Sequence, residues 1–172
     1  MKAKANNNIV LIGFMGVGKG TVARELSKQS KLFAIDCDDL IESKENRKIG
    51  KIFDEDGEKY FRDLEKHTAK WLEKNVKNTI ISTGGGFYKV KNLQKIGTII
   101  YLQSSFDAIF ERILHHPNAK QKLAKRPLLK DLKKAQTIFS ERIKSYKECA
   151  DIVINVENKT PSDIAKEILK HF

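Results

Sequence analysis

The feature that most constrains this chain is a glycine-rich segment at residues 13–21 (GFMGVGKGT), which joins an apolar run to a helical pattern. Residues 8–13 predict a short buried strand, and residues from about 18 to 30 predict a helix. Glycines at this spacing let backbone N–H groups point inward, and the helix N-terminus adds a partial positive charge. Lys19 adds a point charge suited to the β- and γ-phosphates of a nucleotide. The segment therefore predicts a phosphate-binding loop (P-loop).

Short apolar runs alternate with amphipathic segments along the rest of the chain. The runs at residues 8–13, 32–36, 79–82, 98–102 and 151–154 predict strands. Helices are predicted at about residues 18–30, 57–74, 106–113 and 132–146, and from Pro161 onward with Thr160 as the cap. Strands alternating with helices form βαβ units, so we expect a three-layer α/β/α fold around a five-stranded parallel sheet. Because no linker or repeat divides residues 1–172, we expect a single domain.

Positive charge is concentrated in one part of the chain. The net charge is +11, and residues 112–147 contain eleven Lys or Arg against two acidic residues. Such a stretch can bind nucleic acid, form a solvated helix face or receive a polyphosphate substrate, and composition alone does not choose among them. Within it, residues 115–125 have little periodicity. A loop of that length in a compact domain is usually functional or disordered, so we expect a mobile lid at about residues 115–126.

The cysteines and the hydropathy pattern bear on the cellular compartment. Cys37 and Cys149 lie far apart and form no CxxC pair, which excludes a zinc ribbon and suits a reducing environment. No apolar run approaches the ~20 residues of a membrane span. The first residues lack the apolar stretch of a secretory signal. We therefore expect a cytoplasmic protein without a membrane partner.

Charged side chains follow the second predicted strand and recur on the next helix. Asp36 and Asp38 come at the end of that strand, and Asp36 is the acid expected nearest the phosphates. Capping of a helix is the other interpretation of these two residues. Arg62 and Glu65 are i,i+3 neighbours, so Glu65 can hold the guanidinium group in place, although an ordinary surface pair has the same spacing.

Two more segments suggest a ligand pocket. Residues 83–86 (TGGG) follow the third strand and permit close approach by a ligand, or form a flexible turn. Residues 126–129 (RPLL) follow the expected lid, and Arg142 lies on the next predicted helix.

The guanine-reading Asn-Lys-x-Asp motif of GTPase switches is absent, because residues 158–161 read NKTP.

These elements, taken in order, resemble the shikimate kinases over about residues 9–169. The matching elements are GFMGVGKGT, DCD followed by Ile41-Glu42, GEKYFRDLE, TGGG, and RPLL followed by ER…Y…A. The resemblance implies the nucleoside-monophosphate-kinase fold, with its mobile lid. It also implies ATP-dependent phosphorylation of the 3-hydroxyl of shikimate, which gives shikimate 3-phosphate and ADP in the aromatic amino acid pathway.

The resemblance implies a role for each matching position. Asp38 would bind the shikimate hydroxyls and accept the proton of the attacking one, while Arg62 and Arg142 would grip the carboxylate. Arg126 would bridge from the lid to the transferring phosphate, and Asp36 would hold Mg²⁺ through water. The implied catalytic residues are Lys19, Asp38 and Arg126. The implied ATP contacts, with Arg112 and Pro161 beside the adenine, are Gly16, Val17, Gly18, Lys19, Gly20, Thr21, Arg112, Arg126 and Pro161. The implied substrate pocket contains Asp38, Arg62, Gly84, Gly85, Gly86 and Arg142.

Gly20 departs from the family pattern. The residue after the P-loop lysine is normally Ser or Thr, whose hydroxyl binds Mg²⁺. A GKGT loop is similar to that of adenylate kinases, but the Gly-x-Pro-Gly and Asp-Gly-Phe-Pro-Arg segments of those enzymes are absent. We therefore expect ATP oxygens and water to hold the metal, with Asp36 as an anchor through water, and Thr21 to contact the phosphates.

Two other functions compete with this interpretation. A gluconate-type or other small-metabolite P-loop kinase could also use paired arginines to bind a hydroxy acid. A nucleotide- or nucleic-acid-binding module would place aromatic residues among the basic ones to stack bases, but none lies between Ala119 and Ala135. We expect ATP and shikimate as ligands, no nucleic-acid partner and a monomer.

Overall fold

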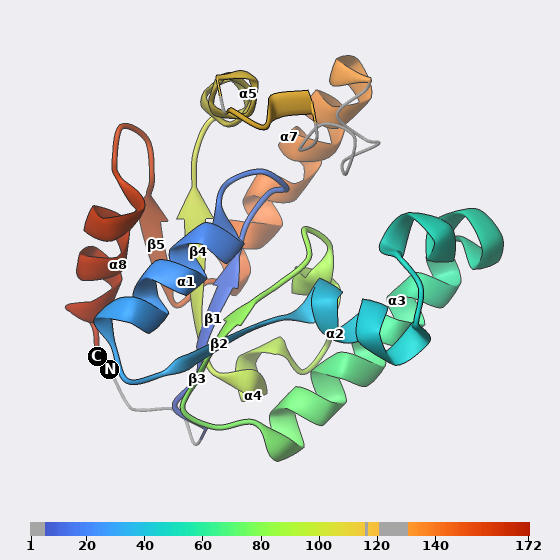
Figure 1. The fold of residues 1–172 in the computed structure, drawn as a ribbon, viewed down its shortest axis with the longest axis horizontal. Helices are drawn as coiled ribbons and strands as arrows, with labels where there is room; N and C mark the ends of the chain where they lie inside the picture. The colour runs from blue at the N-terminus through green and yellow to red at the C-terminus, as the bar shows by residue number, and fades with distance from the viewer. Residues whose placement is uncertain (1–5, 116, 121–130) are drawn as a thin grey trace.

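The computed structural model describes residues 6–115, 117–120 and 131–172 and contains a parallel sheet of five strands (Figure 1). The strands lie in the order β2-β3-β1-β4-β5. Their bounds are β1 Ile9–Ile12, β2 Phe33–Asp36, β3 Thr79–Ser82, β4 Thr98–Gln103 and β5 Ile152–Asn155. Each predicted strand is present to within one residue at each end, and the expected α/β fold is confirmed.

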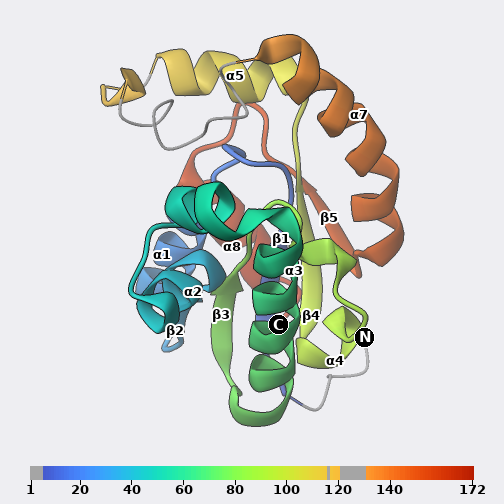
Figure 2. The same cartoon turned by 90° about the vertical axis from the view of Figure 1, so that its right-hand side faces the viewer.

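Helices cover both faces of this sheet. In the part of the chain described, they are α1 Lys19–Gln29, α2 Cys37–Glu45, α3 Ile49–Asn75, the 3₁₀ helix η1 Phe87–Lys89, α4 Leu93–Ile96, α5 Phe106–Leu114, α7 Leu132–Cys149 and α8 Pro161–Leu169. Helices α1 and α8 pack together on one face, and α3 and α4 lie on the other (Figures 1 and 2). No helix among the described residues is long and apolar enough to span a membrane.

The central strands are apolar on both faces because helices cover each of them. Every residue of β1 is buried, and Val10 pairs in register with Ile81 of β3 and with Ile99 of β4. Continuous apolar runs of this kind are typical of buried parallel sheets. At the edge of the sheet, Phe33 opens β2 with most of its surface exposed. Packing in the core therefore fixes the positions of β1, β3 and β4, and with them the first residues of the loops that follow these strands.

Helix α3 is the element that differs most from expectation. The sequence predicts a helix over residues 57–74, whereas α3 runs from Ile49 and is interrupted at Gly57 (φ 80°, ψ 177°). Residues 49–56 are not predicted as a helix because the segment is short, ends in three acidic residues and is followed by Gly57. Ile52, in this first segment of α3, packs with Ile41 and Phe61 in a small hydrophobic cluster apart from the main core.

Candidate active site

The P-loop lies where β1 ends and α1 begins. Gly16 (φ 84°) and Gly18 (φ 104°) both have left-handed backbone conformations that other residues adopt at a cost. Lys19 is 8% exposed, and its Nζ donates to the carbonyls of Gly13 at 2.7 Å and Phe14 at 3.0 Å. The loop thus curls around its own lysine, and phosphate oxygens can replace these two carbonyls as acceptors.

Arg112 reaches this loop from α5. Its Nη2 donates to the carbonyl of Val17 at 2.8 Å and to that of Gly16 at 3.3 Å, and burial lowers the pKa of its guanidinium. Arg112 also borders a groove of about 350 Å³ lined by Ser104, Ala108, Glu111, Arg112, His115, Val156, Glu157, Asn158 and Lys159. Pro161 lies just beyond this lining, as the first residue of α8. Arg112 therefore connects this groove to the P-loop.

Asp36 connects the ends of two neighbouring strands. Its Oδ1 accepts from the backbone N–H of Asp38 at 2.9 Å and caps α2, so the capping interpretation is also correct. Its Oδ2 accepts from the hydroxyl of Ser82 at 2.7 Å. Burial and the neighbouring Asp36 charge raise the pKa of Asp38 to about 7. Such a carboxyl group is suited to exchange a proton near neutral pH.

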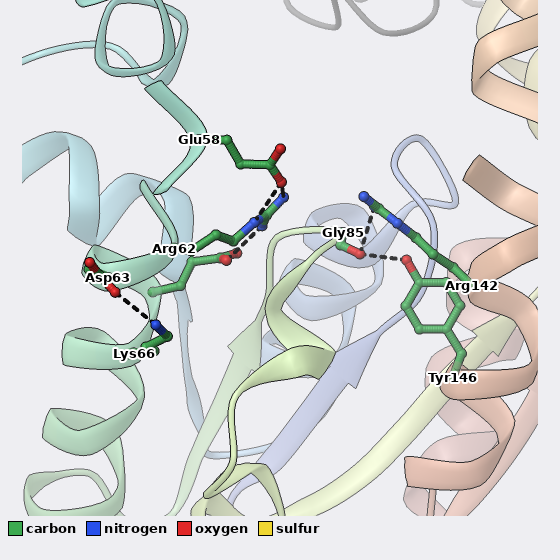
Figure 3. Close-up of polar contacts among 8 residues, drawn as sticks. Glu58, Arg62, Asp63, Lys66, Gly85, Arg142 and Tyr146 are labelled. Carbon is green, nitrogen blue, oxygen red and sulfur yellow. Dashed lines mark hydrogen bonds and ion pairs between the residues drawn. The ribbon is translucent and has the colours of Figure 1, made fainter. Parts of the chain in front are cut away.

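Arg62 is held by two carboxylates of its own helix. Its Nη1 lies 2.7 Å from Glu65 Oε2, and its Nη2 lies 2.9 Å from Glu58 Oε1 (Figure 3). Glu65 is 2% exposed, and burial raises the pKa of its carboxyl group. Its Oε1 has no hydrogen-bond partner among the described residues. The predicted Arg62–Glu65 pair is therefore a half-buried contact that fixes the guanidinium, not an ordinary surface pair.

The TGGG turn after β3 is enclosed by charged side chains. A Cβ at Gly84 would lie 2.8 Å from Asp38 Oδ1, and a Cβ at Gly86 would overlap the Arg62 guanidinium. A Cβ at Gly85 would lie 3.5 Å from Arg142 Nη1. Close approach therefore requires glycine at Gly84 and Gly86, whereas a Cβ at Gly85 would make only ordinary van der Waals contact. The two close approaches favour the pocket over the flexible turn.

Arg142 and Tyr146, one turn apart on α7, both bind the carbonyl of Gly85. Arg142 Nη1 donates at 3.1 Å and the Tyr146 hydroxyl at 2.5 Å. Figure 3 shows Arg62 and Arg142 reaching from opposite sides into the space beside Gly85. Two guanidinium groups in such a position can bind one carboxylate by charge-assisted hydrogen bonds.

The structure brings together all six residues predicted for the substrate pocket. They are Asp38, Arg62, Gly84, Gly85, Gly86 and Arg142. Arg126 and most of the expected lid, residues 116 and 121–126, lie outside the described residues. The sequence analysis does not single out Ser82, and it includes Tyr146 in the ER…Y…A element without assigning it a role. The available signals were a polar residue ending an apolar strand and a tyrosine four residues after Arg142.

A P-loop next to a pocket with two guanidinium groups and a carboxylate, at the carboxyl edge of a parallel sheet, defines a P-loop kinase for a small anionic acceptor. The family model for shikimate kinase matches residues 15–172. The chain belongs to the shikimate kinase family, whose members transfer a phosphoryl group from ATP to shikimate. The interpretation drawn from the sequence motifs is thus confirmed over the gluconate-type and nucleic-acid alternatives.

Individual relatives agree over nearly the whole chain. A shikimate kinase of Helicobacter hepaticus is 37% identical over 163 residues, covering 95% of this chain and 94% of the relative. A shikimate kinase of Persephonella marina is 40% identical over 167 residues, covering 94% and 96%.

Solved structures give the same result. The shikimate kinase of Acinetobacter baumannii in complex with shikimate superimposes with a TM-score of 0.84 at 29% identity, over 98% of this chain and 93% of that one. The shikimate kinase of Aquifex aeolicus gives a TM-score of 0.75 at 35% identity, over 95% and 94%.

Proposed function

We propose that this chain phosphorylates the 3-hydroxyl of shikimate with ATP in the pocket between α3 and α7. The observation that carries this assignment is the position of Arg62 and Arg142 on either side of Gly85. The acceptor's carboxylate binds both guanidinium groups. This contact turns the ring so that its hydroxyls face Asp38 and the P-loop.

Asp38 accepts the proton in the transfer step. The acceptor oxygen forms a bond to the γ-phosphorus, its proton passes to Asp38, and the bond to the ADP oxygen breaks. Lys19 leaves the carbonyls of Gly13 and Phe14 to neutralise phosphate charge. Positioning and charge neutralisation supply most of the catalysis in phosphoryl transfer, and the residues at this edge of the sheet serve those two purposes.

Asp36 and Ser82 provide oxygen atoms that can accept hydrogen bonds from the waters of a hydrated Mg²⁺. Asp36 would hold the ion through water, because Gly20 brings no hydroxyl to the P-loop. When bound with ATP, the ion neutralises charge on the phosphates.

ATP binds along residues 16–21 and continues into the groove bordered by Arg112. The roles of Pro161 beside the adenine and of Arg126 at the transferring phosphate stay predictions. We also propose that residues 1–172 form one domain that acts as a monomer in the cytoplasm, without a nucleic-acid partner.

A coupled ADP-release assay tests the proposed function. ATP and Mg²⁺ are held constant while the acceptor is shikimate, gluconate, AMP or absent. Shikimate is expected to give turnover well above the other three, and isolation of shikimate 3-phosphate identifies the product. Equal or faster ADP release with gluconate or AMP contradicts the proposal.

A further inference from the structure

We propose that Ser82 is a positioning residue for the metal–nucleotide complex and replaces, from β3, the hydroxyl that Gly20 lacks in the P-loop. The inference rests on the proposed function only in taking a Mg²⁺-bound nucleotide as the ligand.

Gly20 lies beside Ser82 and Asp36. Gly20 is the second residue of α1, where a P-loop commonly has Ser or Thr. A Cβ built there would lie 3.9 Å from Ser82 Oγ and 3.8 Å from Asp36 Oδ2. A side chain at residue 20 would therefore meet this pair, and the Ser82 hydroxyl already lies next to the place that a P-loop hydroxyl would occupy.

The fold fixes the Ser82–Asp36 pair independently of any ligand. The two residues are register partners at the ends of β3 and β2, and β3 lies directly beside β1. Ser82 is 2% exposed, and its hydroxyl donates to Asp36 Oδ2 at 2.7 Å. Two neighbouring strands therefore bring an oxygen pair to the first turn of α1.

The direction of this hydrogen bond gives the pair its chemistry. A serine hydroxyl has one proton and two acceptor lone pairs. Because the proton is donated to Asp36, the lone pairs of Ser82 can accept from water. Water bound to a divalent cation donates hydrogens outward, and Mg²⁺ in nucleotide sites keeps several of its waters. The pair is thus suited to bind the hydration shell of a nucleotide-bound Mg²⁺.

The test compares ADP binding in Mg²⁺ with binding in EDTA, by calorimetry, for the wild type, Ser82→Ala, Gly20→Ser and the double variant. The Mg²⁺ effect is the factor by which ADP binds more tightly in Mg²⁺ than in EDTA. This factor is expected to be about tenfold smaller in Ser82→Ala than in the wild type, as for one lost hydrogen bond of ordinary strength. Binding in EDTA should be unchanged. Gly20→Ser should restore the Mg²⁺ effect in the Ser82→Ala background, because it returns a hydroxyl to the P-loop. The new side chain has room, since its Cβ meets nothing closer than Arg24 Nη1 at 3.6 Å.

A purely structural role for Ser82 predicts something else. In that case Ser82→Ala would lower thermal stability but leave the Mg²⁺ effect intact, and adding Gly20→Ser would change nothing. Either an intact Mg²⁺ effect in Ser82→Ala or the absence of restoration by Gly20→Ser overturns the proposal. Thr83→Val is the matched control, because it removes the adjacent buried hydroxyl, which donates to the Leu11 carbonyl at 2.8 Å. It should leave the Mg²⁺ effect unchanged.

Gly20→Ser alone keeps the proposal testable if Ser82→Ala fails to fold. Less than a twofold gain in the Mg²⁺ effect is expected, because Ser82 already serves the metal; a gain of about tenfold would overturn the proposal. Since ADP binding needs no acceptor, these titrations stand even if the wild type fails to phosphorylate shikimate, and that failure would remove only the proposed function.

Discussion

The hydroxyl of Tyr146 donates to the main-chain carbonyl of Gly85 at 2.5 Å, at the turn that separates the two arginines of the pocket. Tyr146 is 1% exposed, stacks on Tyr101 and meets Tyr88 edge to face. The aromatic packing fixes the tyrosine, and the tyrosine fixes the carbonyl that Arg142 also binds. The shape of the pocket therefore depends on a residue at its back, one turn behind the arginine.

Tyr146→Phe removes this hydrogen bond and keeps the ring. The variant is expected to lose about 1 kcal/mol of unfolding free energy, as for one buried hydrogen bond. Its KM for shikimate should rise several-fold while the KM for ATP stays constant, because Gly85 and Arg142 shift together. Steady-state kinetics and urea unfolding measure both effects. Tyr88→Phe is the control, and an equal change there would show that the effect is general.

Arg62→Ala should weaken shikimate binding by roughly 1.5–3 kcal/mol through the loss of a charge-assisted contact. ATP affinity should be nearly unchanged, because Arg62 lies on α3, away from the P-loop. Lys66→Ala, one turn further along α3, removes a cation from an exposed pair with Asp63 and should have no effect on either ligand. Calorimetric titration with each ligand decides, and an equal loss of ATP binding in Arg62→Ala would refute the assigned role.

Gly86→Ala inserts a methyl group where the Arg62 guanidinium lies. Because the arginine must move, the KM for shikimate is expected to rise at least about tenfold, which corresponds to about 1.4 kcal/mol of binding free energy. Gly50→Ala is the matched control in α3, where a Cβ meets nothing within 4 Å. That variant should keep its kinetics and gain up to about 1 kcal/mol of stability. An unchanged KM in Gly86→Ala would show that the contact is dispensable.

Asp38 makes a pH-dependent contribution to stability. Burial raises its pKa in the folded state to about 7, so the folded protein holds this proton more tightly than the unfolded chain does. The group therefore lowers stability progressively as pH rises from about 4 to about 7. Asp38→Asn should remove this loss, so that the metal-free variant is more stable than the wild type at pH 8 and nearly equal at pH 4. Thermal unfolding in EDTA at both pH values measures the difference, and a constant difference would contradict it.

The fold could be predicted largely from local signals. Apolar runs mark the strands, and Thr160 with Pro161 marks the start of α8. The site was harder to predict, because its contacts join residues far apart in the sequence. Spacing alone pairs Arg62 with Glu65, but nothing local places Arg62 against Gly86. For the same reason the Ser82–Asp36 contact follows from the pairing of β3 with β2, which a single strand pattern does not encode.

In the proposed reaction, Arg62 and Arg142 together bind the carboxylate of the acceptor. The most direct measurement is a comparison of kcat/KM for shikimate and for its methyl ester in the wild type and in Arg62→Ala. The wild type is expected to prefer the acid by about a hundredfold, as for two weakened charge-assisted hydrogen bonds, and the variant should lose most of that preference. Equal preference for the acid in both proteins would show that Arg62 does not bind the carboxylate.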